Sequence, residues 1–332
     1  MKAIRTHQTG GPETLTLDEI DAPTPGKGEV LVAVKACAIN YPDGLIIRDM
    51  YQFKPQRPFS PGGEISGVIE ALGEGVEGYA VGDRVLAGIG NGGLAEKVVV
   101  PAGRMFKVPD GVPFEKAASL LMTYGTTIHG LKDRGRIKAG DTVLILGAAG
   151  GVGLSAIELA KAFGARVVAA VSSEAKGEVA RNAGADEVVI YPREAMDKDA
   201  SKALADAFKK ACGPEGANIV YDIVGGQYSE PALRAIAWEG RFLVVGFPAG
   251  IAKMPLNLTL LKSCDICGVF WGAFTARDPE GFHAQVNELF DLMKAGKIDP
   301  LVSETFPLAR AGDAIAKLEA REAVGKLVVT MD

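Results

Sequence analysis

Six consecutive residues have the types and spacing of a turn that binds the phosphates of a dinucleotide. They are Ala148, Ala149, Gly150, Gly151, Val152 and Gly153. In this A-x-G-x-x-G pattern, Gly150 lets a pyrophosphate approach the backbone, and Gly153 lets the following helix pack closely against the preceding strand. The unpaired N–H groups at the start of that helix would bind the phosphate. A tight strand-to-helix turn without a ligand is the alternative.

The elements on both sides of the turn favour the dinucleotide. Residues 142–146 form a continuous apolar run, which is typical of a buried parallel strand. After the turn, apolar residues recur at helical spacing from Val152 to Phe163. A second apolar run at residues 166–171 stands where the next parallel strand is expected. The sequence therefore predicts a bound nicotinamide dinucleotide at this turn.

The residues after the second strand predict which dinucleotide binds. NAD-specific folds normally have an acidic residue at the end of that strand, which binds both ribose hydroxyls. Here the strand ends at Ser172 and Ser173, and Lys176 follows. Two hydroxyls and an ammonium suit the 2′-phosphate of NADPH. Glu174 is able to accept a ribose hydroxyl instead, but its place at the start of a helix equally fits a surface residue. We expect NADPH as the cofactor.

The composition is that of an ordinary globular protein without a basic surface. The chain has 332 residues, 48% of them hydrophobic, which is enough for roughly two domains. Lys and Arg number 36 against 41 Asp and Glu, and the net charge of -5 argues against nucleic acid or a membrane as a partner. The N-terminal residues lack the apolar region of a secretory signal, and no run reaches about 18 apolar residues. We expect a cytoplasmic protein.

The four cysteines are too few and too scattered for a disulfide scaffold, so we expect reduced thiols. Cys264 and Cys267 form a C-x-x-C pair, but no second Cys pair or His pair stands near it at ligand spacing. We interpret the pair as small buried apolar side chains in a strand and predict no metal site.

The order of the predicted elements indicates an α/β protein with two domains. Within residues 1–123, short strands separated by Gly- and Pro-rich turns predict a β-rich, barrel-like domain. Strands and helices alternate over residues 124–261, which predicts a doubly wound parallel sheet. The regularity fades beyond this point, and we assign residues 262–332 to the first domain.

This order of domains resembles the medium-chain dehydrogenase/reductase superfamily over nearly the whole chain. Within it, the stretch from Gly140-Asp141 through Leu144 and the glycine turn to Lys161 is similar to the quinone oxidoreductase (zeta-crystallin-like) family pattern. Glu158 departs from the pattern, because the family usually has Gln there. The resemblance implies a GroES-like catalytic domain of the β-rich barrel type and a Rossmann dinucleotide-binding domain.

The resemblance also indicates which residues would be zinc ligands if the protein used zinc. Zinc-dependent members of the superfamily carry a Cys, the His of a G-H-E motif and a distal Cys or Asp as catalytic ligands. Here Asn40 stands at the position of the Cys and Gly63 at that of the His, and no Cys between Cys37 and Cys212 provides the structural four-cysteine lobe. The resemblance therefore implies chemistry without zinc. Without a Lewis acid to stabilise an alkoxide, hydride donation to an already electrophilic acceptor is favoured over alcohol oxidation.

The acceptor implied by the resemblance is a quinone or another α,β-unsaturated carbonyl, reduced by hydride from NADPH. The residues that line its site by resemblance are Asn40, Asp43, Tyr51 and Glu64. Tyr51 is the candidate for hydrogen-bonding or protonating the acceptor oxygen. A turn at Asn40, a helix start at Asp43 and a structural ion pair at Glu64 are the alternatives.

Several cofactor contacts are expected besides the glycine turn. By resemblance they are Thr126, Lys176, Tyr191 and Lys326. Gly246 and Phe247 follow one predicted strand, and Phe270 and Trp271 follow another, at the carboxyl edge where open α/β sheets bind ligands. A helix-start hydroxyl, a strand-end turn and a core aromatic are the alternative roles for these positions.

Two other functions and one assembly also fit the sequence. Lys54 and Arg57, in the loop at residues 49–63, offer positive charge to an anionic acceptor, as in an enoyl-thioester (acryloyl-CoA-type) reductase. A solvated basic loop is the alternative for these charges. A non-catalytic NADPH-binding protein with a structural or regulatory role is the second function. The apolar run at residues 265–271 predicts an edge strand that pairs in a homodimer.

Overall fold

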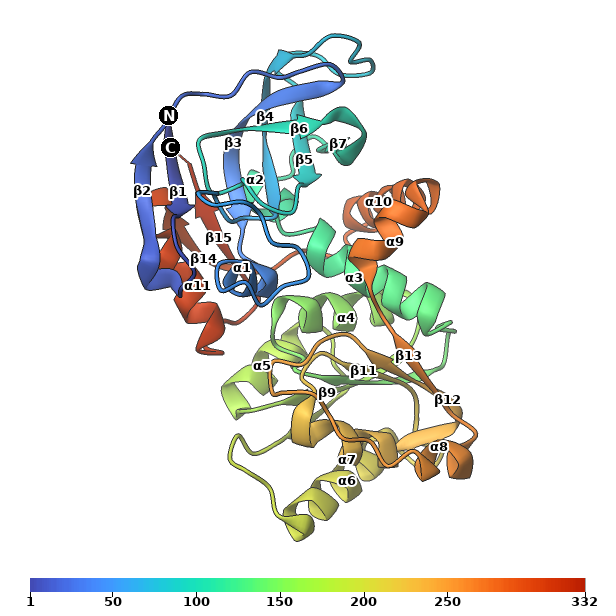
Figure 1. The fold of residues 1–332 in the computed structure, drawn as a ribbon. Helices are drawn as coiled ribbons and strands as arrows, with labels where there is room; N and C mark the ends of the chain where they lie inside the picture. Colours follow the sequence, from blue (N-terminus) through green and yellow to red (C-terminus); the bar gives the residue numbers. More distant parts are fainter. Residues whose placement is uncertain (332) are drawn as a thin grey trace. The chain divides into compact units, whose positions relative to one another are not determined.

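The computed structural model describes residues 1–331 and divides the chain into two compact units (Figure 1). Unit 1 consists of Met1–Met122 and the segment from Pro300 onward. Unit 2 is the continuous segment Thr123–Asp299. Each unit has its own main sheet and its own apolar core.

Unit 2 is organised around a six-stranded sheet in which every neighbouring pair of strands is parallel. In spatial order the strands are β10 (Glu187–Ile190), β9 (Arg166–Val171), β8 (Thr142–Leu146), β11 (Ala217–Asp222), β12 (Ile236–Val244) and β13 (Asp265–Gly268). The chain leaves β8 toward β9 and β10 on one side and continues with β11 on the other. This reversal at β8 is the doubly wound topology, and it confirms the predicted Rossmann-type sheet.

Helices connect these strands and supply the apolar side chains that cover them. They are α4 (Gly151–Ala162), α5 (Glu174–Asn182), α6 (Lys198–Cys212), α7 (Ser229–Arg234) and α8 (Asn257–Lys262). Before β8, helical turns at Leu121–Gly125 and His129–Arg134 flank α3 (Thr126–Ile128). Leu144 and Leu146 of β8 and Phe208 of α6 are fully buried in one cluster, so the apolar run of β8 reflects a strand in the centre of the unit.

The segment at residues 262–299 belongs to unit 2, although its sequence leads us to expect it in the first domain. β13 pairs along its length with β12 and so extends the parallel sheet by one strand. α9 (Trp271–Arg277) and α10 (Pro279–Lys294) follow, and Lys132 Nζ lies 2.7 Å from Glu288 Oε2 of α10. The short strand and the amphipathic helices specify their own structure but not the sheet they join, which depends on long-range pairing.

Unit 1 contains a sheet with the strand order β14-β15-β3-β4-β5-β7, in which β6 also pairs with β3, and a separate two-stranded sheet of β1 and β2. The strands are β1 (Lys2–Thr6), β2 (Leu15–Glu19), β3 (Glu29–Ala38), β4 (Glu64–Leu72), β5 (Arg84–Gly88), β6 (Lys97–Pro101), β7 (Met105–Lys107), β14 (Val302–Pro307) and β15 (Lys326–Thr330). The helices are α1 (Tyr41–Ile46), α2 (Phe114–Ala117) and α11 (Ala311–Glu319). The pairing of β15 with β3 brings the C-terminal segment into the N-terminal sheet and confirms the predicted β-rich domain.

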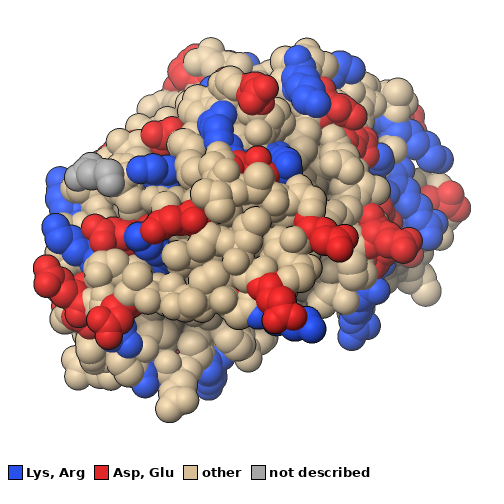
Figure 2. All heavy atoms as spheres, turned by 90° about the horizontal axis from the view of Figure 1, so that it is seen from above, with Lys and Arg blue, Asp and Glu red and all other residues tan. Residues whose placement is uncertain are grey.

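The surface carries both signs of charge. On the face shown in Figure 2, Lys and Arg side chains are interspersed with Asp and Glu side chains. Many of these charges form local pairs; for example, Arg181 Nη1 lies 2.7 Å from Glu174 Oε1. Within residues 1–331, no helix is both long enough and apolar enough to cross a membrane.

Candidate functional site

The glycine turn links β8 to α4 in the way its sequence predicts. Gly147 has a φ of 75°, which favours glycine, and its N–H donates to Ala170 O of the neighbouring strand at 3.0 Å. The N–H of Ala148 donates to the same oxygen at 3.1 Å. Ala148 and Ala149 are buried, whereas Gly150, Gly151 and Val152 are partly exposed at the start of the helix. The backbone of the turn is therefore fixed, and its exposed part is the part expected to face phosphate.

The two motif glycines are needed for different reasons. A Cβ on Gly153 would lie 2.4 Å from Gly147 O and 2.6 Å from the Ala148 carbonyl carbon, so the turn itself excludes a side chain there. A Cβ on Gly150 would meet only Gly147 O at 3.7 Å, and its φ of −80° suits any residue. Nothing in the protein requires glycine at position 150. The open space beside Gly150 fits a phosphate that approaches the backbone.

The end of β9 lies next to the end of β10. Ser172 and Ser173 follow β9, and the Ser173 Oγ caps α5 by accepting from the Lys176 N–H at 3.4 Å. The N–H of Tyr191 donates to Val171 O at 2.9 Å, which places Tyr191 beside the end of β9. Of the four residues expected to contact the adenosine side, Ser172, Ser173 and Tyr191 therefore follow adjacent strand ends, and Lys176 lies in the first turn of α5.

Glu174 is occupied elsewhere. Its carboxylate lies 2.7 Å from the Arg181 guanidinium on the exposed face of α5. This is the surface arrangement that the sequence offers as the alternative to a ribose contact.

The other expected contacts of unit 2 follow β12 or β13, except Thr126. Thr126 begins α3, and Gly246 and Phe247 follow β12, with the Gly246 N–H donating to Asp222 O at 3.3 Å. Phe247 is exposed, whereas Trp271 is buried at the start of α9 and has no hydrogen-bond partner for its Nε1 among residues 1–331. Phe270, which precedes it, is exposed, as a ligand contact or a surface aromatic would be.

The indole ring of Trp271 packs against the helical segment that contains Thr126. A Cβ on Gly125 would lie 2.8 Å from Nε1 of Trp271, so glycine is required there for the ring to fit. The structure thus brings Trp271 close to Thr126, although 145 positions separate them in the sequence. The unpartnered indole N–H is a donor that a bound ligand could use.

Asp222, the last residue of β11, lies at the carboxyl edge of the unit 2 sheet and was not among the predicted site residues. Its Oδ1 accepts from the N–H groups of Val224 at 2.9 Å and Gly225 at 2.8 Å, and its Oδ2 accepts from Ser229 Oγ at 2.5 Å. Burial raises the pKa of the Asp222 carboxyl, and these hydrogen bonds oppose the rise. Asp222 therefore fixes the loop after β11. An acid that closes an otherwise apolar strand at the carboxyl edge is the signal that could have identified it.

In unit 1, four predicted residues meet in one buried cluster. Lys326 Nζ donates to Asn40 Oδ1 at 2.6 Å and to Ile39 O at 3.1 Å, and it lies 3.8 Å from Glu64 Oε2. Asn40 Nδ2 donates to Glu64 Oε2 at 3.0 Å. Asp43 accepts from the Asn40 N–H at 2.7 Å and, with its other oxygen, from the Gly62 N–H at 3.0 Å.

Burial governs the electrostatics of this cluster. It raises the pKa of the Glu64 carboxyl, lowers that of the Lys326 ammonium and raises the pKa of Asp43 to about 6. The attraction of the Lys326 charge opposes the rise at both carboxyls. Tyr51 is half-buried, and burial followed by the charge of Asp43 raises the pKa of its phenol. The cluster is thus a low-dielectric group of charges that compensate one another.

The structure places the Lys326 ammonium against Asn40 and Glu64, which are expected on the acceptor side. The contact of Lys326 with the cofactor stays a prediction. Both hydrogen-bonding ends of the Asn40 amide are occupied within unit 1. Among residues 1–331, no group of three or more His, Cys, Asp and Glu side chains is arranged to hold a metal ion.

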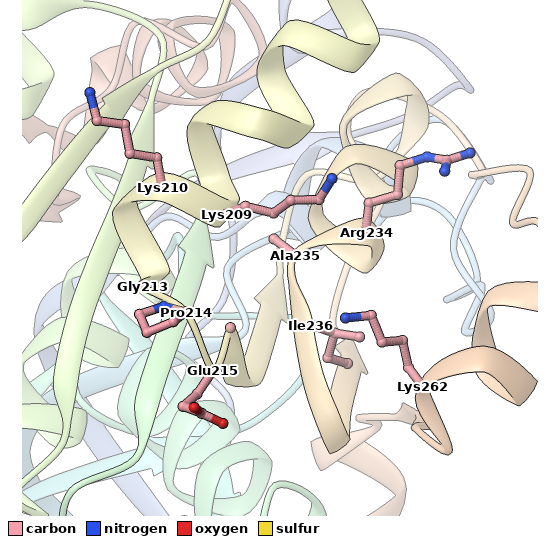
Figure 3. A pocket seen from close by; sticks show the side chains of 10 residues that line it. Lys209, Lys210, Gly213, Pro214, Glu215, Arg234, Ala235, Ile236 and Lys262 are labelled. Carbon is pink, nitrogen blue, oxygen red and sulfur yellow. The ribbon is translucent and has the colours of Figure 1, made fainter.

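A hollow of about 450 Å³ lies at the opposite edge of the unit 2 sheet, where β11 and β12 begin (Figure 3). Its basic side chains include Lys209, which lies 3.1 Å from Asp206, and Arg234, which lies 2.6 Å from Glu230. None of the predicted site residues lines it. Two of its cations are already paired with acids, so this hollow does not compete with the carboxyl edge as the ligand site.

Comparisons with known proteins agree with the two-unit architecture. Residues 26–110 match the alcohol dehydrogenase GroES-like domain, and residues 151–294 match the zinc-binding dehydrogenase family. The chain is 36% identical to a quinone oxidoreductase-like protein 2 homolog from Nematostella vectensis, over 99% of this chain and 88% of that protein.

Solved structures with the same fold include two complexes with NADPH. Escherichia coli quinone oxidoreductase complexed with NADPH superimposes with a TM-score of 0.90 at 29% identity, over 99% of this chain and 100% of the other. A mycobacterial protein complexed with NADPH has a TM-score of 0.91 at 35% identity, over the same shares of the two chains.

Proposed function

Because the chain belongs to the quinone oxidoreductase (zeta-crystallin-like) family of the medium-chain dehydrogenase/reductase superfamily, we propose that it reduces quinones or other α,β-unsaturated carbonyls with NADPH. The observation that carries the proposal is the carboxyl edge of the unit 2 sheet. There Gly150 leaves space that the fold does not need, two hydroxyl residues and Lys176 follow β9, and the one acid among them, Glu174, is paired with Arg181. The two related structures that hold NADPH support the choice of cofactor.

The proposed reaction proceeds without zinc. Asn40 and Gly63 stand where zinc-dependent relatives have their Cys and His ligands. The Asn40 amide is engaged by Lys326 and Glu64, so these residues form an internal network and offer no thiolate or imidazole to a metal. Within this network the Lys326 ammonium compensates the buried Glu64 carboxylate.

The bound nicotinamide supplies the hydride, and the residues of the chain orient the acceptor and provide a proton to its oxygen. We assign the proton to Tyr51. Its raised pKa keeps the phenol protonated at neutral pH, which is the form that donates. Asp43, held by two backbone N–H groups, provides a fixed negative charge near that phenol.

A Tyr51→Phe variant tests this assignment. We expect kcat to fall by about 10²-fold, the usual contribution of a positioned general acid. Tyr79→Phe is the matched control, because Tyr79 is another partly buried tyrosine of unit 1 whose hydroxyl donates to Met105 O at 2.7 Å. Undiminished turnover of Tyr51→Phe would remove the proton-donor role.

An acceptor panel tests the function itself. Protein treated with a chelator is mixed with NADPH and, separately, ortho- and para-quinones, enones and enoyl-CoA esters, and the loss of reduced-nicotinamide absorbance is followed. We expect turnover with quinones or enones. Turnover with enoyl-CoA esters alone would identify an enoyl-thioester reductase. No loss of absorbance with any acceptor, despite NADPH binding, would identify a binding protein. Activity that requires added zinc would overturn the zinc-independent mechanism.

The enoyl-thioester alternative draws little support from the loop that suggested it. Arg57 lies 2.9 Å from Asp49 Oδ1 and donates to Ile47 O at 3.0 Å, so its guanidinium is bound to residues near the start of its own loop. Lys54 is exposed and remains the one charge of the pair that faces solvent. The panel above separates this alternative from the quinone or enone reductase.

The proposed assembly is a homodimer that forms through β13. This strand is at the edge of the unit 2 sheet, and Ile266 and Phe270 beside it are exposed. Unpaired edge strands with apolar side chains commonly pair with another copy. Size-exclusion chromatography with light scattering is expected to give the mass of a dimer; the mass of a monomer would reject this assembly.

A further inference from the structure

Three fully buried hydroxyl side chains of unit 2 form a hydrogen-bonded chain. Tyr221 Oη of β11 donates to Thr127 Oγ1 of α3 at 3.2 Å, and Thr127 Oγ1 lies 2.7 Å from Ser155 Oγ of α4. Ser155 Oγ reaches two backbone carbonyls, Val152 O at 2.9 Å and Thr123 O at 3.2 Å. Because Thr127 accepts from Tyr221, its own proton is donated to Ser155. The chain therefore runs in one direction, from β11 to the first turn of α4.

These hydroxyls are not needed to fill the space. The changes Tyr221→Phe, Thr127→Val and Ser155→Ala would leave nearly the same shapes. A buried hydroxyl costs desolvation energy that its hydrogen bonds largely offset, so the chain adds little net stability. Its bonds are directional, however, and a fully satisfied buried network fixes the placement of the elements that carry it.

The chain joins two places where cofactor contacts are expected. Thr127 directly follows Thr126, which is half-buried, and Val152 belongs to the glycine turn. A second bond ties the same segment to α4 on the other side of Thr126, because Tyr124 Oη donates to Glu158 Oε2 at 2.7 Å. Thr126 is thus flanked by two side-chain ties to the helix that begins at the glycine turn.

We propose that Thr127 is a positioning residue for hydride transfer, because its hydroxyl holds Thr126 in register with the glycine turn. This role rests on the proposed function and adds Thr127, with its partners Tyr221 and Ser155, to the residues that serve it. A dinucleotide bound along the carboxyl edge is expected to contact both places, so a shift of one against the other moves the nicotinamide relative to the acceptor. Hydride transfer depends steeply on this placement, since an error of about 1 Å can cost about 10²-fold in rate.

The test compares two substitutions of this one residue. Thr127→Val keeps the shape and removes the hydroxyl, whereas Thr127→Ser keeps the hydroxyl. Thr259→Val is the control for the chemical change, because the Thr259 hydroxyl donates to Leu256 O at the start of α8 at 2.7 Å. The single-turnover rate of NADPH oxidation by a para-quinone is measured for each protein, and NADPH deuterated at the transferred hydrogen shows that this rate reports hydride transfer. Calorimetry gives the NADPH dissociation constant, and urea unfolding shows that the fold is retained.

We expect Thr127→Val to slow the single turnover by about tenfold while its NADPH dissociation constant stays within about threefold of the wild type. Thr127→Ser and Thr259→Val should stay within about twofold in both quantities. An unchanged rate in Thr127→Val, or an equal loss in Thr127→Ser, would show that Thr127 has only a structural role and would leave the proposed function standing.

Tyr221→Phe is the second variant, because it keeps the ring and removes only the donor at the start of the chain. We expect it to slow the single turnover by about threefold, since the bond between Thr127 and Ser155 remains. If Thr127→Val does not fold, an unchanged rate in Tyr221→Phe overturns the positioning role. A wild type that oxidises NADPH with no quinone, enone or enoyl-CoA ester would overturn the proposed function and this role together.

Discussion

The predicted site residues of the two units have opposite surroundings. In unit 1, Lys326, Asn40 and Glu64 are buried and bond to one another. In unit 2, the carboxyl edge of the sheet leaves open space beside Gly150, and the hydroxyl residues Ser172 and Ser173 follow β9 at the same edge. A cluster whose members compensate one another holds its own fold together. An edge that leaves unused space beside a helix N-terminus is arranged for a ligand.

Gly153→Val is the change with the largest expected effect, because it breaks the turn on which the edge of unit 2 depends. Its Cβ would lie 2.4 Å from Gly147 O, a backbone atom that cannot move without disrupting β8. We expect a loss of about 4 kcal/mol or more in the free energy of unfolding and no measurable NADPH binding. Urea unfolding and calorimetry measure the two quantities.

Gly150→Ala is the matched variant within the same turn. Its Cβ would make only an ordinary contact of 3.7 Å, so stability should stay within about 1 kcal/mol of the wild type. NADPH binding should still weaken, because the methyl group occupies the space assigned to phosphate. If this variant binds NADPH as the wild type does, the phosphate does not lie against Gly150.

Lys326→Met has the next largest expected effect on the free energy of unfolding, and it acts on unit 1. It leaves the Glu64 carboxylate buried without its compensating charge, and breaking a buried pair in this way costs about 3 kcal/mol of unfolding free energy. Lys97→Met is the control, since its pair with Glu70 is on the surface and is worth less than about 1 kcal/mol. Equal losses in urea unfolding for the two variants would show that the buried cluster does not stabilise unit 1.

The ionisation of Asp43 changes the free energy of unfolding by a smaller amount, and its pKa determines whether stability rises or falls with pH. Its pKa is about 6 in the folded chain, raised by burial from 3.8, so the folded state binds more protons between these values. The contribution of Asp43 to stability is therefore present at low pH and is lost as the pH rises through about 6. The unfolding free energy of the wild type should fall relative to that of Asp43→Asn by about 2 kcal/mol between about pH 4 and pH 7.

The asparagine variant also loses a constant amount of stability. Its amide offers one acceptor where two backbone N–H groups, those of Asn40 and Gly62, need one each. The informative quantity is accordingly the change of the difference with pH. A difference that is independent of pH would contradict the raised pKa.

The same contrast explains what the sequence could predict. The glycine turn of unit 2 is local, and the predicted strand at residues 142–146 matches β8 because strand, turn and helix are adjacent in the chain. The cluster of unit 1 joins Asn40 to Lys326 across 286 positions. No local pattern specifies such a pair, so the sequence alone does not predict that Lys326 bonds to Asn40.

Other features could not be predicted from the sequence for related reasons. Residues 262–299 have clear local patterns, but their membership of unit 2 depends on the pairing of β13 with β12. The structural alternative considered for Glu64 matches the ion pair with Lys326, which only the fold reveals.

The central claim is that the edge of unit 2 recognises the phosphorylated cofactor for a reduction that needs no zinc. The most direct measurement compares the initial-rate specificity constants, kcat/KM, for NADPH and NADH with one para-quinone acceptor in the presence of a chelator. The account predicts that NADPH is preferred by about tenfold or more, the contribution of a charge-assisted phosphate contact. A specificity constant for NADH that equals or exceeds that for NADPH would contradict it.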